Sequence, residues 1–485
     1  RQIYYSLMRR ATVSSLLFVP VASGLLSSLV SRFNRMTRRT AAFDVSSLGV
    51  SWEGLRSETS AELRLDEETL RRGKSNARAT VREFSTATAK DEVTLYRDSA
   101  SWCPYSQKVW NLLEEAKVDY KIEKINMACY GDKPASFFAV QPSGTLPAAT
   151  INDSIFGTSD SIIAKVLDEY ASVDDLDARG DFRCGYLLKL ERQHFSAWLR
   201  WLTGGDGNKD QFVRVLDAVE DAIAGPYFLG DRFSVVDLAY APFLERMAAS
   251  LAYFKGYVVR ETPYLAQKKE SSDDGLYAFR RYPKLNAWFA AMESREAYQA
   301  TAADFYTHAH DLPPQLGGCV KSRNPDAEAV RADVDGACWA TDSGPKYEPL
   351  SSWITHDPKL EAAARLADNG PNVAKFAARA VGFPGFPPAR AELADPNARP
   401  DDQIVPLVDA ILRLAVKRLR GQEDDESSKA HIDQWLTGDP QDAALARESL
   451  AYLRDRVGVP RDMSFPAALA LRRECNALIH CLNDD

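Results

Sequence analysis

The sequence lacks the features that would mark a nucleic-acid-binding protein or a small secreted one. Its formal net charge is −8, so there is no excess of Lys and Arg to neutralise phosphates. Cysteine is sparse: the seven cysteines are odd in number and spread over 485 residues, unlike the dense framework of a small disulfide-rich domain. These absences argue against nucleic acid as a partner. They favour reduced thiols in a reducing compartment.

A paired set of metal ligands is also missing. Cys475, His480 and Cys481 lie close together in the sequence, but a structural zinc site needs four ligands in paired short spacings, and no second pair accompanies them. We therefore predict no metal. What is present is an ordinary globular composition, with 45% hydrophobic and 26% charged residues, long enough for roughly two to four domains.

Acidic residues are absent from residues 1–43, which contain seven arginines. The uncharged stretch Ala11–Val30 follows a basic start, as in a signal sequence, and the Arg- and Ser-rich continuation is typical of an organelle transit peptide. Together they resemble the bipartite plastid signals of algae with complex plastids. A mitochondrial address and a membrane anchor are the alternatives, although Pro20 and Gly24 weaken an anchor. The polar residues 44–90 are predicted to be a linker.

Strand and helix patterns alternate between residues 91 and 172. A β-type run at Val93–Tyr96 precedes a helix that begins at Pro104, where proline is favoured, and continues to Glu115. Further strands are predicted at Tyr120–Ile125, Gly144–Ile151 and Ile155–Phe156, followed by a helix that opens at Ser159–Ser161. A proline at the start of the third strand is compatible with a cis peptide bond at Pro147. The order βαβ-ββα predicts an α+β domain.

Cys103 is the residue with the clearest chemical potential. It directly precedes Pro104, so it is expected to cap the helix, where free backbone N–H groups and the helix dipole stabilise a thiolate. A pKa lowered from ~8.5 to ~6.5 would leave the sulfur mostly ionised at neutral pH. The alternative is an inert buried cysteine. Because residue 106 is serine, no disulfide can form within this motif.

The motif from Trp102 to Ser106 and the segment Gly144–Pro147 resemble those of the cysteine-type glutathione transferases, which include the omega, lambda and dehydroascorbate reductase groups. The resemblance covers residues 92 to about 315. It implies a thioredoxin-like N-terminal domain, Cys103 as the nucleophile and glutathione as the cosubstrate. The residues that it implies for glutathione binding are Tyr105, Lys133, Leu146, Pro147, Asp160 and Ser161. Taken singly, each also has a structural interpretation, such as a helix cap or a solvated surface charge.

Helical patterns replace strands over residues 173–316. Ser234 and Asp237 have the spacing of a capping box, which resembles the one in the all-helical C-terminal domain of glutathione transferases. Trp198, Trp201 and Tyr240 are candidates for the second-substrate pocket, with the helical core as the alternative. Residues 317–485 are predicted to form an additional, mostly helical extension that docks to the rest of the chain or to a protein partner.

Two functions are compatible with these features. The first is a glutathione-dependent thiol transferase or oxidoreductase that reduces mixed disulfides or dehydroascorbate through a Cys103–glutathione adduct. Its partners would be glutathione and a small electrophilic or oxidised substrate, and relatives suggest a homodimer. The second is a non-catalytic assembly or scaffold subunit of an organellar complex that uses the transferase fold.

Overall fold

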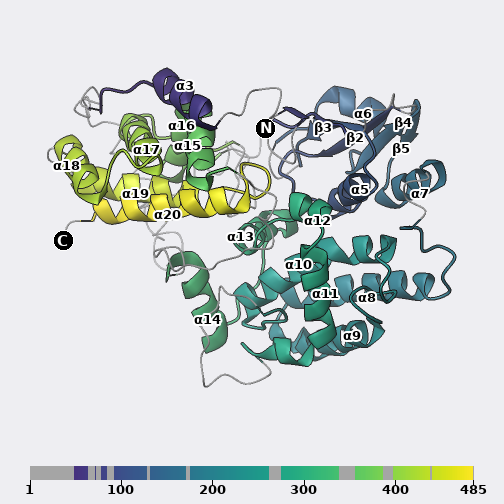
Figure 1. Cartoon of the computed structure of the whole chain (residues 1–485). Coiled ribbons are helices and arrows are strands. Elements are labelled where there is room, and N and C mark those ends of the chain that lie inside the picture. The colour runs from purple at the N-terminus through teal and green to yellow at the C-terminus, as the bar shows by residue number, and fades with distance from the viewer. Residues whose placement is uncertain are drawn as a thin grey trace, which may run out of the picture.

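The computed structural model describes residues 48–63, 71–72, 78–84, 92–127, 131–170, 175–261, 275–337, 356–385, 397–436 and 440–483. The predicted targeting segment, Cys129 and Cys338 lie outside these residues. Figure 1 shows three groups of elements: a sheet with flanking helices, a cluster of helices that follows it in the chain, and a second helical group that contains the C-terminal helices.

A mixed five-stranded sheet forms the thioredoxin-like domain, in the order β1-β3-β2-β4-β5. Strands β2 and β3 are parallel, and the other neighbours are antiparallel. The strands are β1 (Val81–Arg82), β2 (Val93–Asp98), β3 (Tyr120–Ile125), β4 (Ala148–Ile151) and β5 (Ser154–Phe156). The helices are α5 (Pro104–Glu115), α6 (Ala135–Val140) and α7 (Ser159–Glu169). The predicted α+β fold is confirmed, whereas α6, at six residues, is too short to show helical periodicity in the sequence.

The helical domain begins with α8 and is built around α10, which is buried along its whole length. Its capping box is as predicted: Asp237 accepts the backbone N–H of Ser234 at 2.9 Å. Trp198, Trp201 and Tyr240 are at most 2% exposed, so they belong to the core. The helices are α8 (Cys184–Thr203), α9 (Lys209–Ala222), α10 (Val235–Lys255), α11 (Pro283–Glu293), α12 (Glu296–Thr301), α13 (Phe305–Leu316) and α14 (Pro325–Ala332).

Residues 317–337 continue this helical domain, although the sequence pattern places them in the extension. Helix α14 packs on α10, and the connecting backbone bonds to the same domain, with Val320 N–H donating to Leu202 O at 2.9 Å and Ser322 N–H to Phe254 O at 2.8 Å. Residues 92–337 are called the transferase body below. Among the described helices of the chain, none combines the length and the apolar character needed to cross a bilayer.

The second helical group contains a helix from the predicted linker. Helix α3 (Trp52–Leu63) packs on α15 (Pro358–Asp368), and the indole of Trp52 donates to Asp409 at 2.7 Å. The remaining helices of this group are α16 (Gly370–Ala377), α17 (Val405–Leu419), α18 (Asp425–Trp435), α19 (Pro440–Arg454) and α20 (Phe465–Cys481). We call residues 48–63 and 356–483 together the C-terminal module.

The range 44–90 is therefore more than a linker. Besides α3, it supplies β1, which pairs with β3, and Arg82 at the end of β1 binds Glu114 of α5 through two bonds of 2.7 and 2.8 Å. In Figure 1 α3 lies beside α15 and α16, far from the sheet. The sequence does not reveal this because the partners of α3 are hundreds of residues away.

The module docks on the transferase body through a fully buried ion pair. Arg472 of α20 donates to Asp304, at the start of α13, at 2.6 Å, and neither side chain is exposed to solvent. The guanidinium also donates to Thr307 at 3.1 Å and to the carbonyl of Val457 at 2.7 Å. Because a buried charge needs a partner, this pair fixes the extension against α13.

Candidate active site

Cys103 lies at the N-cap position of α5, as predicted. Pro104 is the first residue of the helix, and the side chain of Cys103 makes no capping hydrogen bond. The residue follows directly on the loop after β2, so its sulfur lies at the end of a buried strand and at the start of a buried helix. This position leaves backbone amides of the first helical turn facing the sulfur.

The peptide bond between Leu146 and Pro147 is cis, as expected, and it leads into β4 next to Cys103. The sulfur of Cys103 lies 3.9 Å from the carbonyl oxygen of Leu146. Lys133, ahead of α6, reaches the same segment, where its ammonium donates to the carbonyl of Gly144. Four of the seven predicted site residues, Cys103, Lys133, Leu146 and Pro147, thus converge on one segment.

Asp160 and Ser161 lie in the first turn of α7, which packs on α5. The N-cap of α7 is Thr158, and a capping box joins it to Ser161: the Ser161 N–H donates to the Thr158 hydroxyl at 3.1 Å. Asp160 is exposed at the helix start. The carboxylate of Asp160 is therefore open to a ligand, whereas the hydroxyl of Ser161 already donates to the carbonyl of Thr158 at 2.9 Å.

Tyr105 faces away from these groups, toward the helical domain. Its hydroxyl accepts from Arg192 of α8 at 3.2 Å, and its ring makes an edge contact with Phe243 of α10 at 5.6 Å. The guanidinium of Arg192 lies 4.7 Å from the centre of the Phe243 ring, and the ammonium of Lys108 lies 4.8 Å from it. No sequence motif marks Arg192 or Lys108, which the fold brings to Tyr105 from α8 and from the next turn of α5.

Burial raises the pKa of the Cys103 thiol, and the nearby carboxylate of Asp98 raises it further. The Ser106 hydroxyl and the amides of Ser106 and Tyr105 lower it, as expected of a helix start, but they do not outweigh burial. The residue is only 9% exposed, with buried Trp102 before it and buried Pro147 beside it. The prediction of a lowered pKa is therefore wrong, because a sequence shows a helix start but not how well the surroundings exclude water.

Two charged groups hold the loop that carries Cys103. The carboxylate of Asp98 accepts the backbone N–H of Trp102 at 2.5 Å, and Arg246 of α10 donates to the Trp102 carbonyl at 2.7 Å. Arg246 belongs to a buried network in which Glu245 accepts from Gln107 of α5 at 2.8 Å and lies 3.1 Å from His308. The helical domain thus fixes the position of the cysteine loop through the network.

The C-terminal module reaches the same loop from another side. The guanidinium of Arg461 lies 4.9 Å from the centre of a Trp102 ring. Gly458 packs so closely on this indole that an added Cβ would lie 3.2 Å from it. This segment is anchored by Val459, whose N–H donates to the Thr307 hydroxyl of the transferase body at 3.1 Å. The extension therefore forms part of the surroundings of Cys103.

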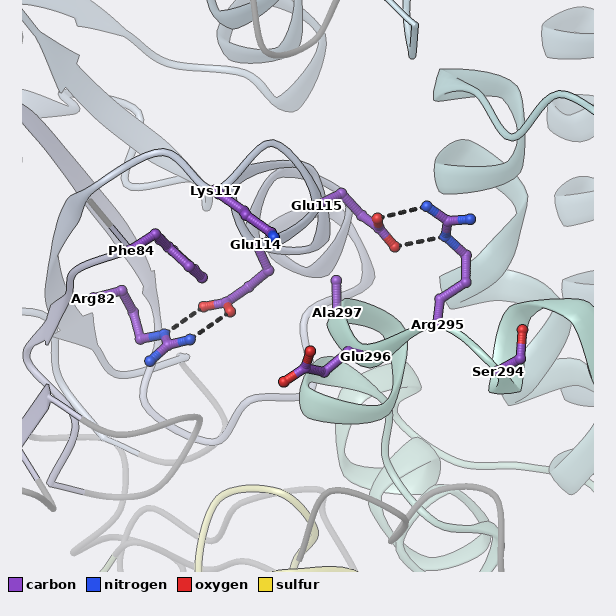
Figure 2. A pocket seen from close by; sticks show the side chains of 9 residues that line it. All are labelled: Arg82, Phe84, Glu114, Glu115, Lys117, Ser294, Arg295, Glu296 and Ala297. Carbon is purple, nitrogen blue, oxygen red and sulfur yellow. Dashed lines mark hydrogen bonds and ion pairs between the residues drawn. The ribbon is translucent and has the colours of Figure 1, made fainter. Parts of the chain in front are cut away.

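A polar cleft of about 510 Å³ lies at the opposite end of α5 and is separate from this site. Figure 2 shows Glu114 directed to Arg82 and Glu115 directed to Arg295, each through paired bonds. Glu115 and Arg295 join α5 to the helical domain. Since twelve helical residues rise by about 18 Å, this cleft is far from Cys103.

Within the described part of the chain, no three His, Cys, Asp or Glu side chains are grouped so that they could hold a metal ion. The site near α5 brings together one buried thiol, a cis-proline segment and the cationic side chains of Lys108 and Arg192.

Two family models match the chain. Residues 102–169 match the N-terminal domain of glutathione S-transferase, and residues 189–291 match its C-terminal domain. These segments coincide with the sheet domain that holds Cys103 and with the helices around α10. The two segments belong to the glutathione S-transferase family.

Among the relatives of this chain, the Arabidopsis thaliana protein "Glutathione S-transferase DHAR2" is 28% identical over 207 residues, 41% of this chain and 84% of the relative. "Glutathione S-transferase DHAR3, chloroplastic", also from Arabidopsis thaliana, is 27% identical over 172 residues, 35% of this chain and 64% of the relative. The crystal structure of glutathione transferase Omega 3C from Trametes versicolor is 20% identical and covers 54% of this chain and 96% of its own, with a TM-score of 0.37. The names of the two Arabidopsis relatives give no support to the scaffold alternative.

Proposed function

We propose that this protein is a glutathione-dependent thiol transferase that reduces mixed disulfides or a small oxidised compound such as dehydroascorbate. The observation that carries the proposal is the position of Cys103 at the start of α5, with its sulfur 3.9 Å from the carbonyl of Leu146 and beside cis-Pro147. An extended peptide such as glutathione can bond to the backbone of this segment as an added strand does.

Glutathione would bind along Leu146 and Pro147, with its ammonium near Asp160 and a carboxylate near Lys133. Lys133 would exchange its bond to the Gly144 carbonyl for a charged one, which is stronger. Ser161 lies at the same helix start, where its N–H and its hydroxyl both bond to Thr158. The second substrate is expected on the side of Tyr105, beside Lys108 and beside Arg192, which pairs with Glu191.

The chemistry balances as two thiol–disulfide exchanges. The Cys103 thiolate attacks one sulfur of a mixed disulfide between glutathione and another thiol, so that the other thiol leaves and a Cys103–glutathione disulfide remains. A second glutathione thiolate then attacks this bond, releasing glutathione disulfide and restoring Cys103. With serine at position 106, the resolving thiol comes from glutathione. Because burial raises the pKa of Cys103, a base or a change in the surroundings on binding must promote ionisation.

The full chain assayed with hydroxyethyl disulfide and with dehydroascorbate, each with glutathione, tests this function. Cys103→Ser should abolish turnover, since the nucleophile is lost, whereas Cys319→Ser, a change at a partly exposed thiol remote from the motif, should leave it intact. Activity that survives Cys103→Ser, or no activity with either substrate, would contradict the proposal.

We also propose that residues 1–43 direct the protein to a plastid. Support comes from their arginine- and serine-rich, acid-free composition, and a relative is named as chloroplastic. A fluorescent protein fused behind residues 1–90 should accumulate in plastids, whereas a fusion with the seven arginines replaced by Gln should not. Localisation in mitochondria or retention in a membrane would refute this address.

A further inference from the structure

A cavity of about 730 Å³, a volume typical of small-molecule sites, is lined by residues of the C-terminal module and by Arg78, which precedes β1. None of the residues proposed for glutathione binding lines it, so it is a separate site. Five arginines and only two acids, Asp368 and Asp462, are among its lining residues, so these side chains carry a net charge of +3. The arginines are Arg78, Arg365, Arg379, Arg456 and Arg461.

The two acids are already engaged. Asp368 pairs with Arg78 and accepts from it, and the nearby Arg56 donates to its backbone carbonyl at 2.8 Å. Asp462 pairs with Arg461, at 2.7 Å. Each acid thus pairs with an arginine of the cavity, and a third arginine, Arg456, donates to the carbonyl of Tyr452 at 3.1 Å.

Arg365 and Arg379 are the cations that remain available. Neither guanidinium makes a hydrogen bond or an ion pair with another described residue, and Arg379 lies only against the ring of Phe376, at 5.5 Å. Arg365 is partly buried on α15, and burial lowers its pKa. The carboxylates of Glu361, Asp368 and Asp462 act on Arg365 from nearby, but none of them is hydrogen-bonded to it, so its N–H groups remain available to an anionic ligand.

Arg365 also affects the pKa of a neighbouring lysine. Burial lowers the pKa of Lys124, on β3, to about 7, and the charges of Arg97 and Arg365 contribute to the shift.

The rest of the cavity wall is apolar. It is formed by Leu366, Val373, Phe376, Leu453, Val457 and Leu471. A small inorganic anion would leave this surface uncovered, whereas a ligand with an apolar or aromatic portion would bury it.

We propose that this cavity binds a multiply charged organic phosphate whose apolar or aromatic portion packs against Val373 and Phe376 while Arg365 and Arg379 bind its phosphates. Guanidinium groups match phosphate oxygens in pairs, and a di- or triphosphate is needed to balance a charge of +3. The site adjoins the cysteine loop, because Arg461 lines the cavity and also lies 4.9 Å from a Trp102 ring.

Isothermal titration of the full chain with ATP, with inorganic pyrophosphate and with adenosine tests the site. We expect saturable binding of one ATP per chain, weaker binding of pyrophosphate and none of adenosine at the same concentrations. Saturating glutathione should not compete. The double variant Arg365→Gln/Arg379→Gln should weaken ATP binding at least tenfold. The control Arg214→Gln removes the same kind of charge from an exposed position on α9 and should change nothing.

The absence of saturable ATP binding would overturn the proposal, as would unchanged affinity in the double variant or competition by glutathione. If circular dichroism shows that the double variant is misfolded, the single variant Arg379→Gln must still weaken ATP binding at least threefold and Arg379→Lys must recover part of it. Unchanged binding in the folded Arg379→Gln variant would also overturn it. Cys103→Ser should bind ATP like the parent, so this test is independent of the proposed transferase activity.

Discussion

The transferase body and the C-terminal module differ in how far apart their contacts lie in the sequence. In the body, strands β2 and β3 and their helix α5 are neighbours in the chain, and a capping box marks the start of the central helix. In the module, Trp52 bonds to Asp409, 357 residues later, and α3 packs on α15. Local patterns predict the first kind of structure. The second kind depends on packing between distant segments, for which the sequence carries no local signal.

The two regions also use buried charge for different contacts. In the body, Glu245 and Arg246 connect α10 to the cysteine loop. Between body and module, Arg472 and Asp304 connect α20 to α13. The first set holds the reactive loop within the family domain, and the second attaches the added module to it. If this distinction is right, the variants below should affect the two regions separately.

Arg472→Met should have the largest effect. It leaves the buried Asp304 carboxylate without its cation, and breaking a buried ion pair costs about 3–5 kcal/mol. Urea unfolding should show the lower free energy of unfolding. Limited proteolysis should show that the module is cleaved before the body. Arg323→Met, at an exposed position of the body, is the matched control and should be neutral within about 0.5 kcal/mol. Equal stability of both variants would mean that the module is not held by this pair.

Gly370→Ala should destabilise the module by about 1–3 kcal/mol, because an added Cβ would lie 2.5 Å from the Trp52 ring and would push α3 away. Gly185→Ala on α8 is the opposite case, since its Cβ would meet nothing within 4 Å and alanine favours a helix. Thermal unfolding should therefore show a lower midpoint for the first variant and an unchanged or higher one for the second. A neutral Gly370→Ala would show that α3 is not docked as described.

The pH dependence of Cys103 alkylation tests the effect of burial. A raised pKa leaves the thiol mostly protonated at pH 7, so the rate with iodoacetamide should keep rising from pH 7 to beyond 9. A lowered pKa, as the helix start alone suggests, would produce a plateau near neutral pH. Mass spectrometry of the Cys103 peptide gives the rate, with partly exposed Cys319 as the internal comparison.

Gly458→Val should have the smallest effect. It tests whether the module shields Cys103 through its contact with Trp102. The added side chain would crowd Trp102, against which Gly458 packs, and should loosen the wall beside Cys103. We expect alkylation of Cys103 to accelerate about two- to fivefold, equivalent to less than about 1 kcal/mol. Gly207→Val, at an exposed turn of the body with open space around it, should leave the rate unchanged. An identical rate in both variants would mean that the module does not shield the cysteine.

Much of the candidate site could be predicted because its residues carry local signals. A cysteine before a proline predicts a helix cap, and a proline at a strand start predicts the cis bond at Pro147, and the structure has both. Arg192 and the Trp102 contact of Arg461 could not be predicted, since they depend on which distant helices face the motif. The prediction of a lowered pKa for Cys103 fails for the same reason, because burial is a property of the assembled fold.

The central claim is that Cys103 exchanges disulfides with glutathione, and trapping its adduct tests that claim most directly. The full chain would be incubated with glutathione disulfide, alkylated and mapped by mass spectrometry. We predict one glutathione per chain, on Cys103, that is removed by fresh glutathione and is absent from Cys103→Ser. An adduct confined to other cysteines such as Cys319, or a Cys103 adduct that glutathione cannot remove, would contradict the account.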